Sequence, residues 1–276
     1  MLVVGGGPAG LEAARVAALR GHKVTLAEAS SVLGGTLRAA AKAPTRHGMI
    51  DIATWLESEV FRLGVDVQLS TYMDEEDVIE SGAESVIVAT GSFPRMDGIQ
   101  HSHPGQPIRN FERKNVISSF DLFMQPPANL GKTAVVIDDV GHYEGIAASE
   151  HLINAGLSVT YVTRLRMFAP QAQGPLMVEP FLTRMRGKPF EYLIRHRAVE
   201  FTEDEVLISP THFTDDADLR RLPADTIVFV SANAPNRELF TALSDRNTDV
   251  RVVGDANSPR FLQSAIREGH LAGASI

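Results

Sequence analysis

The sequence predicts an α/β fold built from two similar halves, each a parallel β-sheet with helices on its faces. Three observations predict it: a glycine-rich turn joins a strand to a helix at the N-terminus, a second strand–turn–helix unit begins near residue 135, and similar later segments follow in both halves. Strands that alternate with helices are typical of βαβ units, which form parallel sheets. With 276 residues, 44% of them hydrophobic, the chain is long enough for two such domains.

The first unit opens with a short hydrophobic strand, Leu2–Val4, then the turn GGGPAG and a helix over Leu11–Leu19. The turn fits the pattern GxGxxG, in which each glycine has a mechanical task. Gly5 permits the tight turn, Gly7 lets backbone amides approach a pyrophosphate, and Gly10 lets the helix pack closely on the strand. Because unpaired amides and the macrodipole favour an anion at the helix N-terminus, the turn predicts a Rossmann-like dinucleotide-binding unit.

A second strand, Lys23–Ala27, ends in Glu28, eighteen residues after Gly10. A carboxylate at this point can accept hydrogen bonds from the ribose hydroxyls of an adenosine, and its charge disfavours a 2′-phosphate. The first half therefore favours FAD, NAD or ADP over NADP. An alternating strand over 65–69 and a buried strand over 85–91 extend the same sheet.

The second half repeats this plan with an altered turn. Val135–Ile137 matches the first strand and Gly145–Ala155 the first helix, but DDVGHYEG replaces GGGPAG and is longer by two residues. Asp138 stands in place of the first glycine, while Asp139 and Glu144 add further carboxylates. Negative charges at this point oppose the attraction that a helix N-terminus normally offers to a pyrophosphate.

Other positions of the second half give evidence both for and against nucleotide binding. Thr163 replaces Glu28, Ala232 replaces Gly91, and the cations Arg164 and Arg166 could receive the 2′-phosphate of NADP. Since such a clamp is of little use when the pyrophosphate cannot dock, we predict that the second half has lost NAD(P)H binding, with NADP binding as the alternative. The acidic turn and His142 would then cap the helix or bind a partner surface.

The order GGGPAG, Glu28, LGG, ATG and VVGDA resembles that of the two-dinucleotide-fold flavoproteins of the glutathione-reductase-like superfamily, over essentially the whole chain. In detail, GHYEG and GDANSPRFLQSAIREGHLAG resemble the C-terminal portion of the trimethylamine dehydrogenase, histamine dehydrogenase and 2,4-dienoyl-CoA reductase group, related to old yellow enzyme. There, this portion follows a TIM barrel that carries FMN, a four-iron cluster and the substrate site. The chain lacks the barrel and any cysteine, so the resemblance implies the reductase-like half alone. The short first strand suggests a fragment, a processed chain or a separate subunit.

The resemblance and the overlay of the halves imply a glutathione-reductase-like arrangement in which the second domain is inserted in the first. The expected FAD- or ADP-binding domain is 1–112 with 240–276, and the expected NAD(P)-binding-like domain is 113–239. The resemblance also implies which residues surround FAD, or alternatively ADP as in trimethylamine dehydrogenase, with Met73 acting through its backbone: Gly5, Gly7, Pro8, Ala9, Gly10, Glu28, Gly35, Thr36, Met73, Thr90, Gly91, Gly254 and Asp255.

From these expectations we predict an FAD-binding (or ADP-binding) module or subunit of a flavin-dependent oxidoreductase. It would pass electrons to or from a barrel partner that carries FMN and an iron–sulfur cluster, in a hetero- or homo-oligomer. Because the flavin itself carries the redox chemistry, no catalytic side chain is required and none is named. Two alternatives stay open: a non-catalytic ADP-binding docking module, and a free-standing NAD(P)H-dependent FAD reductase.

Composition narrows the remaining classes. A net charge of −8 without a basic run gives no reason to expect nucleic acid or an anionic membrane as a partner. The sequence has no apolar stretch of membrane-spanning length and no signal peptide, so a cytoplasmic location is expected. No further ligands accompany His101 and His103 at metal-binding spacing, so no metal site is predicted. Trp55, at helical spacing from Ile52 and Val60, is expected in the core.

Overall fold

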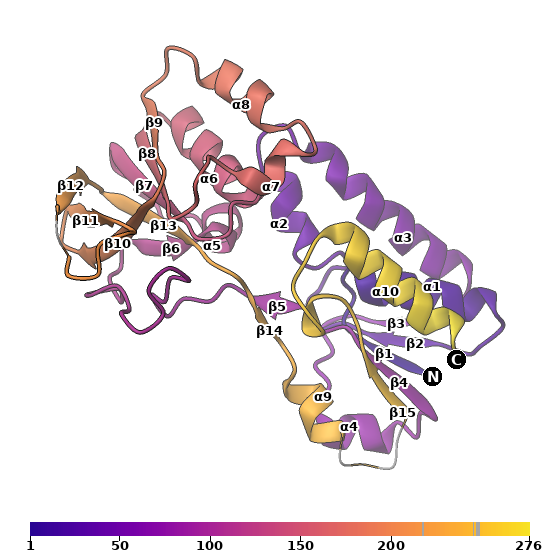
Figure 1. The fold of residues 1–276 in the computed structure, drawn as a ribbon. Helices are drawn as coiled ribbons and strands as arrows, with labels where there is room; N and C mark the ends of the chain where they lie inside the picture. The colour runs from indigo at the N-terminus through magenta and orange to yellow at the C-terminus, as the bar shows by residue number, and fades with distance from the viewer. Residues whose placement is uncertain (217, 245, 247–248) are drawn as a thin grey trace. The chain divides into compact units, whose positions relative to one another are not determined.

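The computed structural model describes residues 1–276 except 217, 245, 247 and 248. The chain divides into two compact units, each described by itself below. Unit 1 comprises Met1–Lys42, Arg46–Phe93 and Asn233–Ile276, and unit 2 comprises Ala43–Thr45 and Pro94–Ala232. Both ends of the chain, indigo and yellow in Figure 1, therefore belong to unit 1, and unit 2 is inserted between them. This confirms the predicted α/β fold with one domain inserted in the other.

Unit 1 is built on a five-stranded parallel sheet with the order β15-β4-β1-β2-β3. Its strands are β1 (Leu2–Val4), β2 (Thr25–Ala27), β3 (Asp66–Gln68), β4 (Ser85–Val88) and β15 (Asp249–Val252). A two-stranded antiparallel ribbon pairs β5 (Ser92–Phe93) with β14 (Ala234–Pro235). The helices are α1 (Pro8–Leu19), α2 (Leu37–Lys42), η1 (His47–Met49), α3 (Ile50–Arg62), α4 (Glu75–Glu80), α9 (Glu238–Leu243), η2 (Gly254–Ala256) and α10 (Leu262–Ala274).

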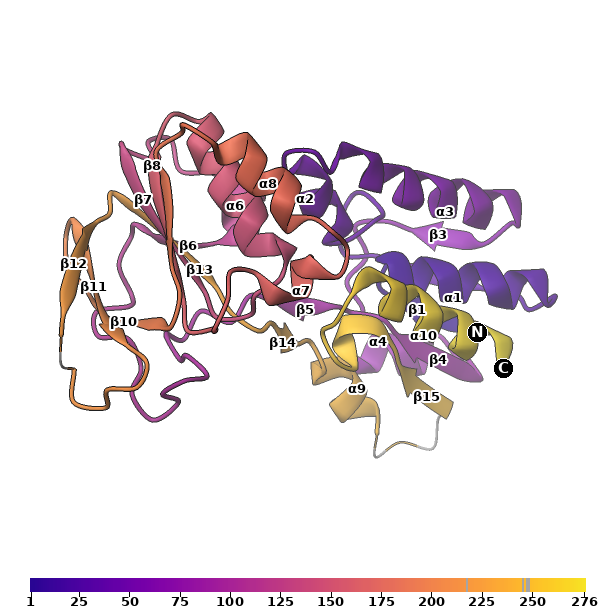
Figure 2. The same ribbon diagram turned by 45° about the horizontal axis from the view of Figure 1, so that its top comes forward.

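Both faces of this sheet are covered. Helices α3, α1 and α10 lie side by side on one face (Figures 1 and 2), where Val3, Leu26 and Ile87 form the core with them. On the other face, α4 and α9 cover Leu2 and Val86. Burial on both faces explains why the central strands β1 and β4 read as continuous hydrophobic runs, whereas the edge strand β3 alternates.

Helix α10 returns from the end of the chain to pack directly on α1. A Cβ atom added at Gly269 would lie 2.1 Å from the carbonyl oxygen of Ala9, and one at Gly273 would lie 2.5 Å from that of Ala13. No side chain other than hydrogen fits at such a distance. Two glycines one turn apart therefore hold the two backbones in contact and fix the segment before α10 beside the start of α1.

Unit 2 contains a second five-stranded parallel sheet, with the order β6-β13-β7-β8-β9, and a three-stranded antiparallel sheet, β10-β11-β12. The strands of the first are β6 (Val116–Ser118), β7 (Thr133–Asp138), β8 (Ser158–Thr163), β9 (Phe190–Leu193) and β13 (Thr226–Val230). Those of the second are β10 (His196–Phe201), β11 (Glu205–Pro210) and β12 (Arg220–Pro223). The helices are α5 (Ser119–Met124), α6 (Tyr143–Asn154), α7 (Pro170–Gln173) and α8 (Val178–Met185).

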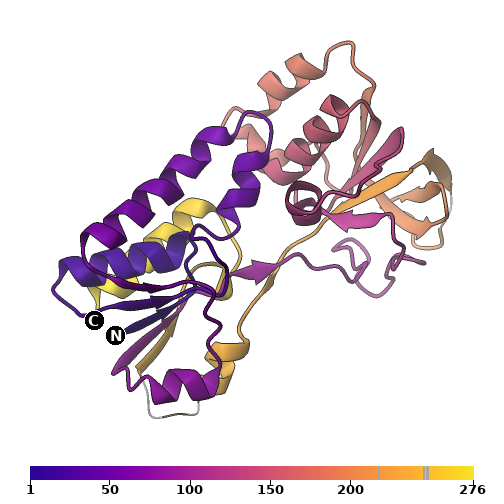
Figure 3. The ribbon, with the colours of Figure 1, turned by 180° about the vertical axis from the view of Figure 1, so that it is seen from behind.

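The antiparallel sheet covers one face of the parallel sheet of unit 2, while the helices lie toward the other (Figures 1 and 3). Phe201 and Ile208 of the small sheet pack with Val135, Ile137 and Phe229 of the large one. The layered plan of unit 2 thus repeats that of unit 1, with a β-meander in place of α4 and α9.

The expectation that Trp55 lies in the core is wrong. Its side chain is exposed (53% of the residue), and the Arg15 guanidinium lies 5.3 Å from its ring centre. The buried residues of α3 are Ala53, Leu56 and Val60. One residue is 100° around a helix, so Trp55 points away from the face that Leu56 buries, toward the outer edge of α1.

One buried carboxylate joins the two helices that pack on each other. Glu12 of α1 is 5% exposed; it accepts hydrogen bonds from Nε and Nη2 of Arg15, at 2.7 and 2.8 Å, and lies 2.9 Å from Nδ1 of His270 in α10. Burial raises the pKa of Glu12, but the hydrogen bonds and charges of Arg15 and His270 outweigh it, so that the pKa lies below its usual value.

We expect Glu12→Gln to lower the free energy of unfolding by about 1–3 kcal/mol at neutral pH, since Arg15 loses a charged partner in a buried place. A folded-state pKa below the unfolded one gives stability that is present above the unfolded pKa of about 4.3 and is lost as the pH falls through the folded value. The difference between wild type and variant should therefore narrow below about pH 4. Urea unfolding at a series of pH values measures it.

The exposed pair of Glu59 and Arg62 on α3 offers a control, because Glu59→Gln should change stability much less. An equal loss for both variants, or a loss for Glu12→Gln that does not depend on pH, would contradict this account.

Candidate nucleotide-binding site

All thirteen sequence-predicted site residues belong to unit 1, and several of them follow a strand of its sheet within two residues. Gly5 follows β1, Glu28 follows β2, Thr90 follows β4, and Gly254 follows β15. The carboxyl ends of parallel strands meet at one edge of a sheet, and open α/β sheets bind ligands outside that edge. The structure therefore brings these residues to the edge where a nucleotide site is expected on physical grounds.

The glycines of the first turn (residues 5–7) and of α1 differ in what surrounds them. A Cβ at Gly5 would lie 2.3 Å from the carbonyl oxygen of Ala89, and one at Gly10 only 1.9 Å from that of Gly5. At Gly7, by contrast, no atom of the described residues lies within 4 Å of the Cβ position. Gly5 and Gly10 thus serve close packing, whereas Gly7 borders open space in front of the N-terminus of α1, where helix amides attract an anion.

Glu28 is held in place by the backbone beside it. Its two carboxylate oxygens accept hydrogen bonds from the amides of Gly6, at 2.6 Å, and Ser30, at 2.7 Å. Each oxygen keeps a further lone pair, which a hydroxyl group of a ligand could use. The amide of Gly34 bonds to the carbonyl of Gly6 at 2.8 Å, so that the loop before α2, with Gly35 and Thr36, also lies against the first turn.

The turn after β15 approaches the same helix. Gly254 has φ +65°, and a Cβ there would lie 2.7 Å from that of Ala9, in the first turn of α1. The carboxylate of the next residue, Asp255, accepts hydrogen bonds from the Ser92 hydroxyl, at 3.2 Å, and from the Arg260 amide, at 3.3 Å. Burial raises the pKa of Asp255, against these two hydrogen bonds. Asp255 is therefore a half-buried acid beside the start of α1.

Two side chains that sequence reasoning did not identify fix this turn. Glu268 of α10 accepts a hydrogen bond from the amide of Gly254 at 2.9 Å, while Arg237 donates from Nε to the carbonyl of Ala256 at 2.9 Å and also binds the carbonyl of Asn257. Glu268 is fourteen residues from Gly254 and Arg237 nineteen from Ala256. Their spacing carries no motif, so only the fold brings them together.

Three of the predicted residues are engaged with the protein rather than directed at open space. The hydroxyl of Thr90 donates to the carbonyl of Asn236 at 2.7 Å, and the carbonyl of Gly91 accepts from the amide of Asn236 at 2.9 Å. Met73 is partly buried against the cluster that α4 and α9 form. These contacts fix Thr90 and Gly91 to the segment that contains Asn236.

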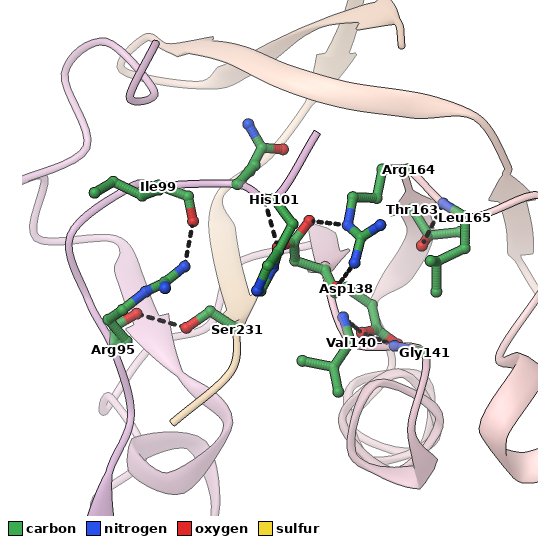
Figure 4. Close-up of polar contacts among 12 residues, drawn as sticks. Arg95, Ile99, His101, Asp138, Val140, Gly141, Thr163, Arg164, Leu165 and Ser231 are labelled. Atoms are coloured by element: carbon green, nitrogen blue, oxygen red, sulfur yellow. Dashed lines mark hydrogen bonds and ion pairs between the residues drawn. The ribbon is translucent and has the colours of Figure 1, made fainter. Parts of the chain in front are cut away.

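In unit 2, the second turn (residues 139–142) is filled by acidic side chains. Asp138, the last residue of β7, is completely buried. One carboxylate oxygen accepts hydrogen bonds from the amides of Val140, at 2.8 Å, and Gly141, at 2.7 Å (Figure 4). The other oxygen accepts a hydrogen bond from the hydroxyl of Tyr161. Burial raises the pKa of Asp138 against these hydrogen bonds, and it raises the pKa of Tyr161 well above its usual value. The turn amides that would meet a phosphate already have an anionic acceptor.

Asp139 is the second acidic residue of the same strand–turn segment, and its carboxylate pairs with Arg164. Its carboxylate, 1% exposed, binds Nε of Arg164 at 2.7 Å, the amide of His101 at 2.8 Å and Nδ1 of His101 (Figure 4). Arg164 also donates from Nη2 to the carbonyl of Asp139 at 3.0 Å. The arginine that the sequence offers as a 2′-phosphate ligand is therefore paired with a carboxylate of its own chain.

Side chains cover what remains of the second turn. A Cβ at Gly141 would lie 2.4 Å from Cδ1 of Leu165 and 2.8 Å from Cδ of Pro170. The amide of Gln171, in α7, donates to the carbonyl of Gly141 at 3.0 Å. His142 is the N-cap residue of α6 without a side-chain capping hydrogen bond, so the expected capping role of His142 is wrong. The carboxylates of Asp138 and Asp139 accept hydrogen bonds from backbone and side-chain donors of their own chain.

The described part of the chain contains no group of three His, Asp or Glu side chains placed to hold a metal ion. Instead, His101 binds Asp139, and burial lowers the pKa of His103. None of the helices in the described part is long and apolar enough to cross a membrane.

Comparison with known proteins agrees with this geometry. Residues 1–269 match the family described as pyridine nucleotide-disulphide oxidoreductase, and the chain belongs to this family of flavin-dependent oxidoreductases. Its members generally bind FAD.

Within that family, the proteins to which the chain is similar include several amine dehydrogenases. The N,N-dimethylglycine/sarcosine dehydrogenase of Chromohalobacter salexigens is 37% identical over 59% of this chain and 23% of its own length. The histamine dehydrogenase of Rhizobium sp. 4-9 superposes with a TM-score of 0.90 at 28% identity, over all of this chain and 43% of its own. The NADH oxidase of Thermoanaerobacter brockii is 29% identical over 98% of this chain and 40% of its own. The chain thus spans less than half the length of these relatives.

The second turn yields a prediction on stability. Tyr161→Phe removes the hydroxyl that serves one oxygen of buried Asp138, and we expect it to lower the free energy of unfolding by about 1–3 kcal/mol. Tyr192→Phe, at a half-exposed position of β9, is the matched control and should change it little. Urea unfolding of the two variants compares them, and equal stability would show that the Asp138–Tyr161 contact contributes nothing.

Proposed function

We propose that this chain is the FAD-binding module of a flavin-dependent oxidoreductase, and that its second unit does not bind NAD(P)H. One contrast carries the proposal: the first turn leaves open space beside Gly7 at a helix N-terminus, whereas the second turn is filled by Asp138, Asp139 and the side chains that cover Gly141. Since both turns follow the same strand–turn–helix plan, the difference lies in the side chains and not in the fold.

The residues of the first site fit an adenine dinucleotide. The open space at Gly7 suits a pyrophosphate, and the Glu28 carboxylate, fixed by two amides, suits the two hydroxyls of a ribose without a 2′-phosphate. We therefore propose that all thirteen residues predicted from the sequence hold FAD, with Asp255 on the side of the ribityl chain and the pyrophosphate. When bound, FAD supplies hydride and electron transfer, and the protein supplies binding and orientation.

The partner is proposed on the lengths of the relatives. The chain covers 43% of the histamine dehydrogenase and 40% of the NADH oxidase, so these proteins contain other parts that it does not match. We propose that a barrel domain or subunit with FMN, and with an iron–sulfur cluster, exchanges electrons with the FAD. The substrate would be bound by that partner. A cytoplasmic location and an oligomeric assembly remain part of the proposal.

Three features of the second turn support the proposal that unit 2 does not bind NAD(P)H. Asp138 accepts the hydrogen bonds of the turn amides, Asp139 neutralises Arg164, and Leu165 with Pro170 occupies the space beside Gly141. A dinucleotide would have to displace buried, hydrogen-bonded carboxylates and bring its own negative charge beside them. This argument favours a module without nicotinamide binding over a free-standing reductase.

The first test identifies the bound nucleotide. We expect the purified chain to release one FAD when it is denatured, as measured by chromatography and by flavin absorbance of the native protein. Gly7→Ala should reduce the bound FAD at least about tenfold while leaving the melting temperature of the nucleotide-free protein unchanged, because its methyl group enters only the space that the pyrophosphate needs. Release of ADP without flavin would instead support the ADP-binding docking module.

Gly10→Ala is the contrasting variant, because its Cβ would meet a carbonyl oxygen at 1.9 Å and should destabilise the fold whether or not a nucleotide is present. Full FAD content in folded Gly7→Ala would remove the first turn from the proposed site.

The second test addresses NAD(P)H. We expect NADPH and NADH to bleach the bound flavin no faster than they reduce free FAD under the same conditions, as followed by stopped-flow absorbance. Bleaching that is fast, saturates with NADPH and slows in Arg164→Ala would show that the second unit does bind the nucleotide, and the exclusion would then be wrong.

A further inference from the structure

Arg164 and His101, beside the second turn, both bind the carboxylate of Asp139. Asp139 is almost completely buried and contacts Arg164 on one side and both the backbone amide and the ring of His101 on the other. These donors come from two separate segments: Arg164 directly follows β8, and His101 lies in the loop between β5 and β6. Figure 4 labels the His101 and Arg164 side chains beside the end of β7, where Asp138 is marked.

The backbone of Asp139 is fixed independently of its side chain. Its amide donates to the carbonyl of Val230 at 2.9 Å, within the pairing of β7 and β13. Loss of the carboxylate would therefore leave the turn in position. It would also leave a guanidinium that is 27% exposed, with a backbone amide and an imidazole beside it and no counter-charge from this residue.

We propose that the second turn is a latent phosphate site in which the carboxylate of Asp139 stands where an external anion would bind, so that Asp139 is the residue that excludes anionic ligands from this turn. The inference rests on the proposed function, in which the second unit carries no nucleotide. A charged group that loses a buried partner is strongly destabilised, and an external anion can restore the lost interaction. A guanidinium, a backbone amide and an imidazole are the donors that bind phosphate well.

The latent site is small. Leu165 and Pro170 stay against Gly141 when Asp139 is replaced, and Asp138 keeps the amides of Val140 and Gly141. There is thus no path along the turn for a pyrophosphate, and access is from the side of His101, whose side chain is 45% exposed. Inorganic phosphate should bind to the opened site, whereas NADPH should not.

The experiment uses the full chain with its own nucleotide retained in the first site, so that the first turn cannot take up phosphate. Asp139→Ala is titrated with inorganic phosphate, and binding is followed by calorimetry and by the melting temperature. We expect phosphate to raise the melting temperature of the variant and to bind at least about tenfold more tightly than to wild type. Adding Arg164→Ala to the variant should abolish this gain.

Two further variants make the result specific. Asp139→Ser is used in parallel, since its hydroxyl can still accept from the His101 amide and its fold should be better preserved. Glu150→Ala removes another buried carboxylate of unit 2, which binds Nε and Nη2 of Arg184, and so also releases an arginine. It should gain no comparable phosphate affinity, because the hydrogen bonds between Glu150 and Arg184 involve neither a backbone amide nor an imidazole.

Phosphate that affects neither Asp139 variant, or that stabilises Glu150→Ala to the same extent, would overturn the proposal. So would phosphate that binds to wild type as tightly as to Asp139→Ala. These outcomes are distinct from failure of the proposed function, which is read from flavin bleaching by NADPH in the unmodified protein and uses no phosphate.

Discussion

The amides at the start of a helix that follows a β-strand need an acceptor, and the two units of this chain meet that need in different ways. In unit 1, Glu28 takes the amide of Gly6 from the neighbouring strand, and the front of α1 beside Gly7 is left open. In unit 2, Asp138 takes two amides from within the turn. An acceptor placed on the next strand leaves room for a ligand, whereas an acceptor placed inside the turn occupies that room.

In both units a glycine in the first turns of the helix allows the helix to lie very close to the end of the preceding strand. Gly10 lets α1 approach the carbonyl of Gly5, and the corresponding Gly145 lets α6 approach the Asp138 carboxylate, since a Cβ there would lie 2.6 Å from it. The same glycine position thus serves two purposes: in one unit it brings the helix onto the strand, and in the other it makes space for a buried acid. The fold is kept while the chemistry of the turn changes.

The sequence predicted the features that depend on local pattern. The first turn, Glu28 and the inserted second unit follow from glycine spacing, strand periodicity and the repeat, all of which are visible along the chain. The contacts that decide what each turn does are not local. Asp139 meets Arg164 twenty-five residues later, and Glu268 holds Gly254 from the middle of α10. The prediction that Trp55 lies in the core is wrong, because its spacing from Ile52 and Val60 locates the buried face of the helix only to within about 100°, the rotation between successive residues.

The two units also differ in what would stabilise their turns: an external ligand in unit 1, and carboxyl groups of the chain itself in unit 2. A unit with an open turn is stabilised by a ligand in proportion to the logarithm of one plus the ligand concentration over its dissociation constant, so the proposed nucleotide would add to the stability of unit 1. The carboxyl groups in the turn of unit 2 belong to the chain itself, so their presence does not depend on the concentration of a ligand. Buried carboxylates cost desolvation, which is visible in the raised pKa of Asp138, but Tyr161, Arg164 and the turn amides offset that cost. A dinucleotide-type fold can therefore be stable with a filled turn, because the turn amides and Arg164 have carboxylate partners within the chain.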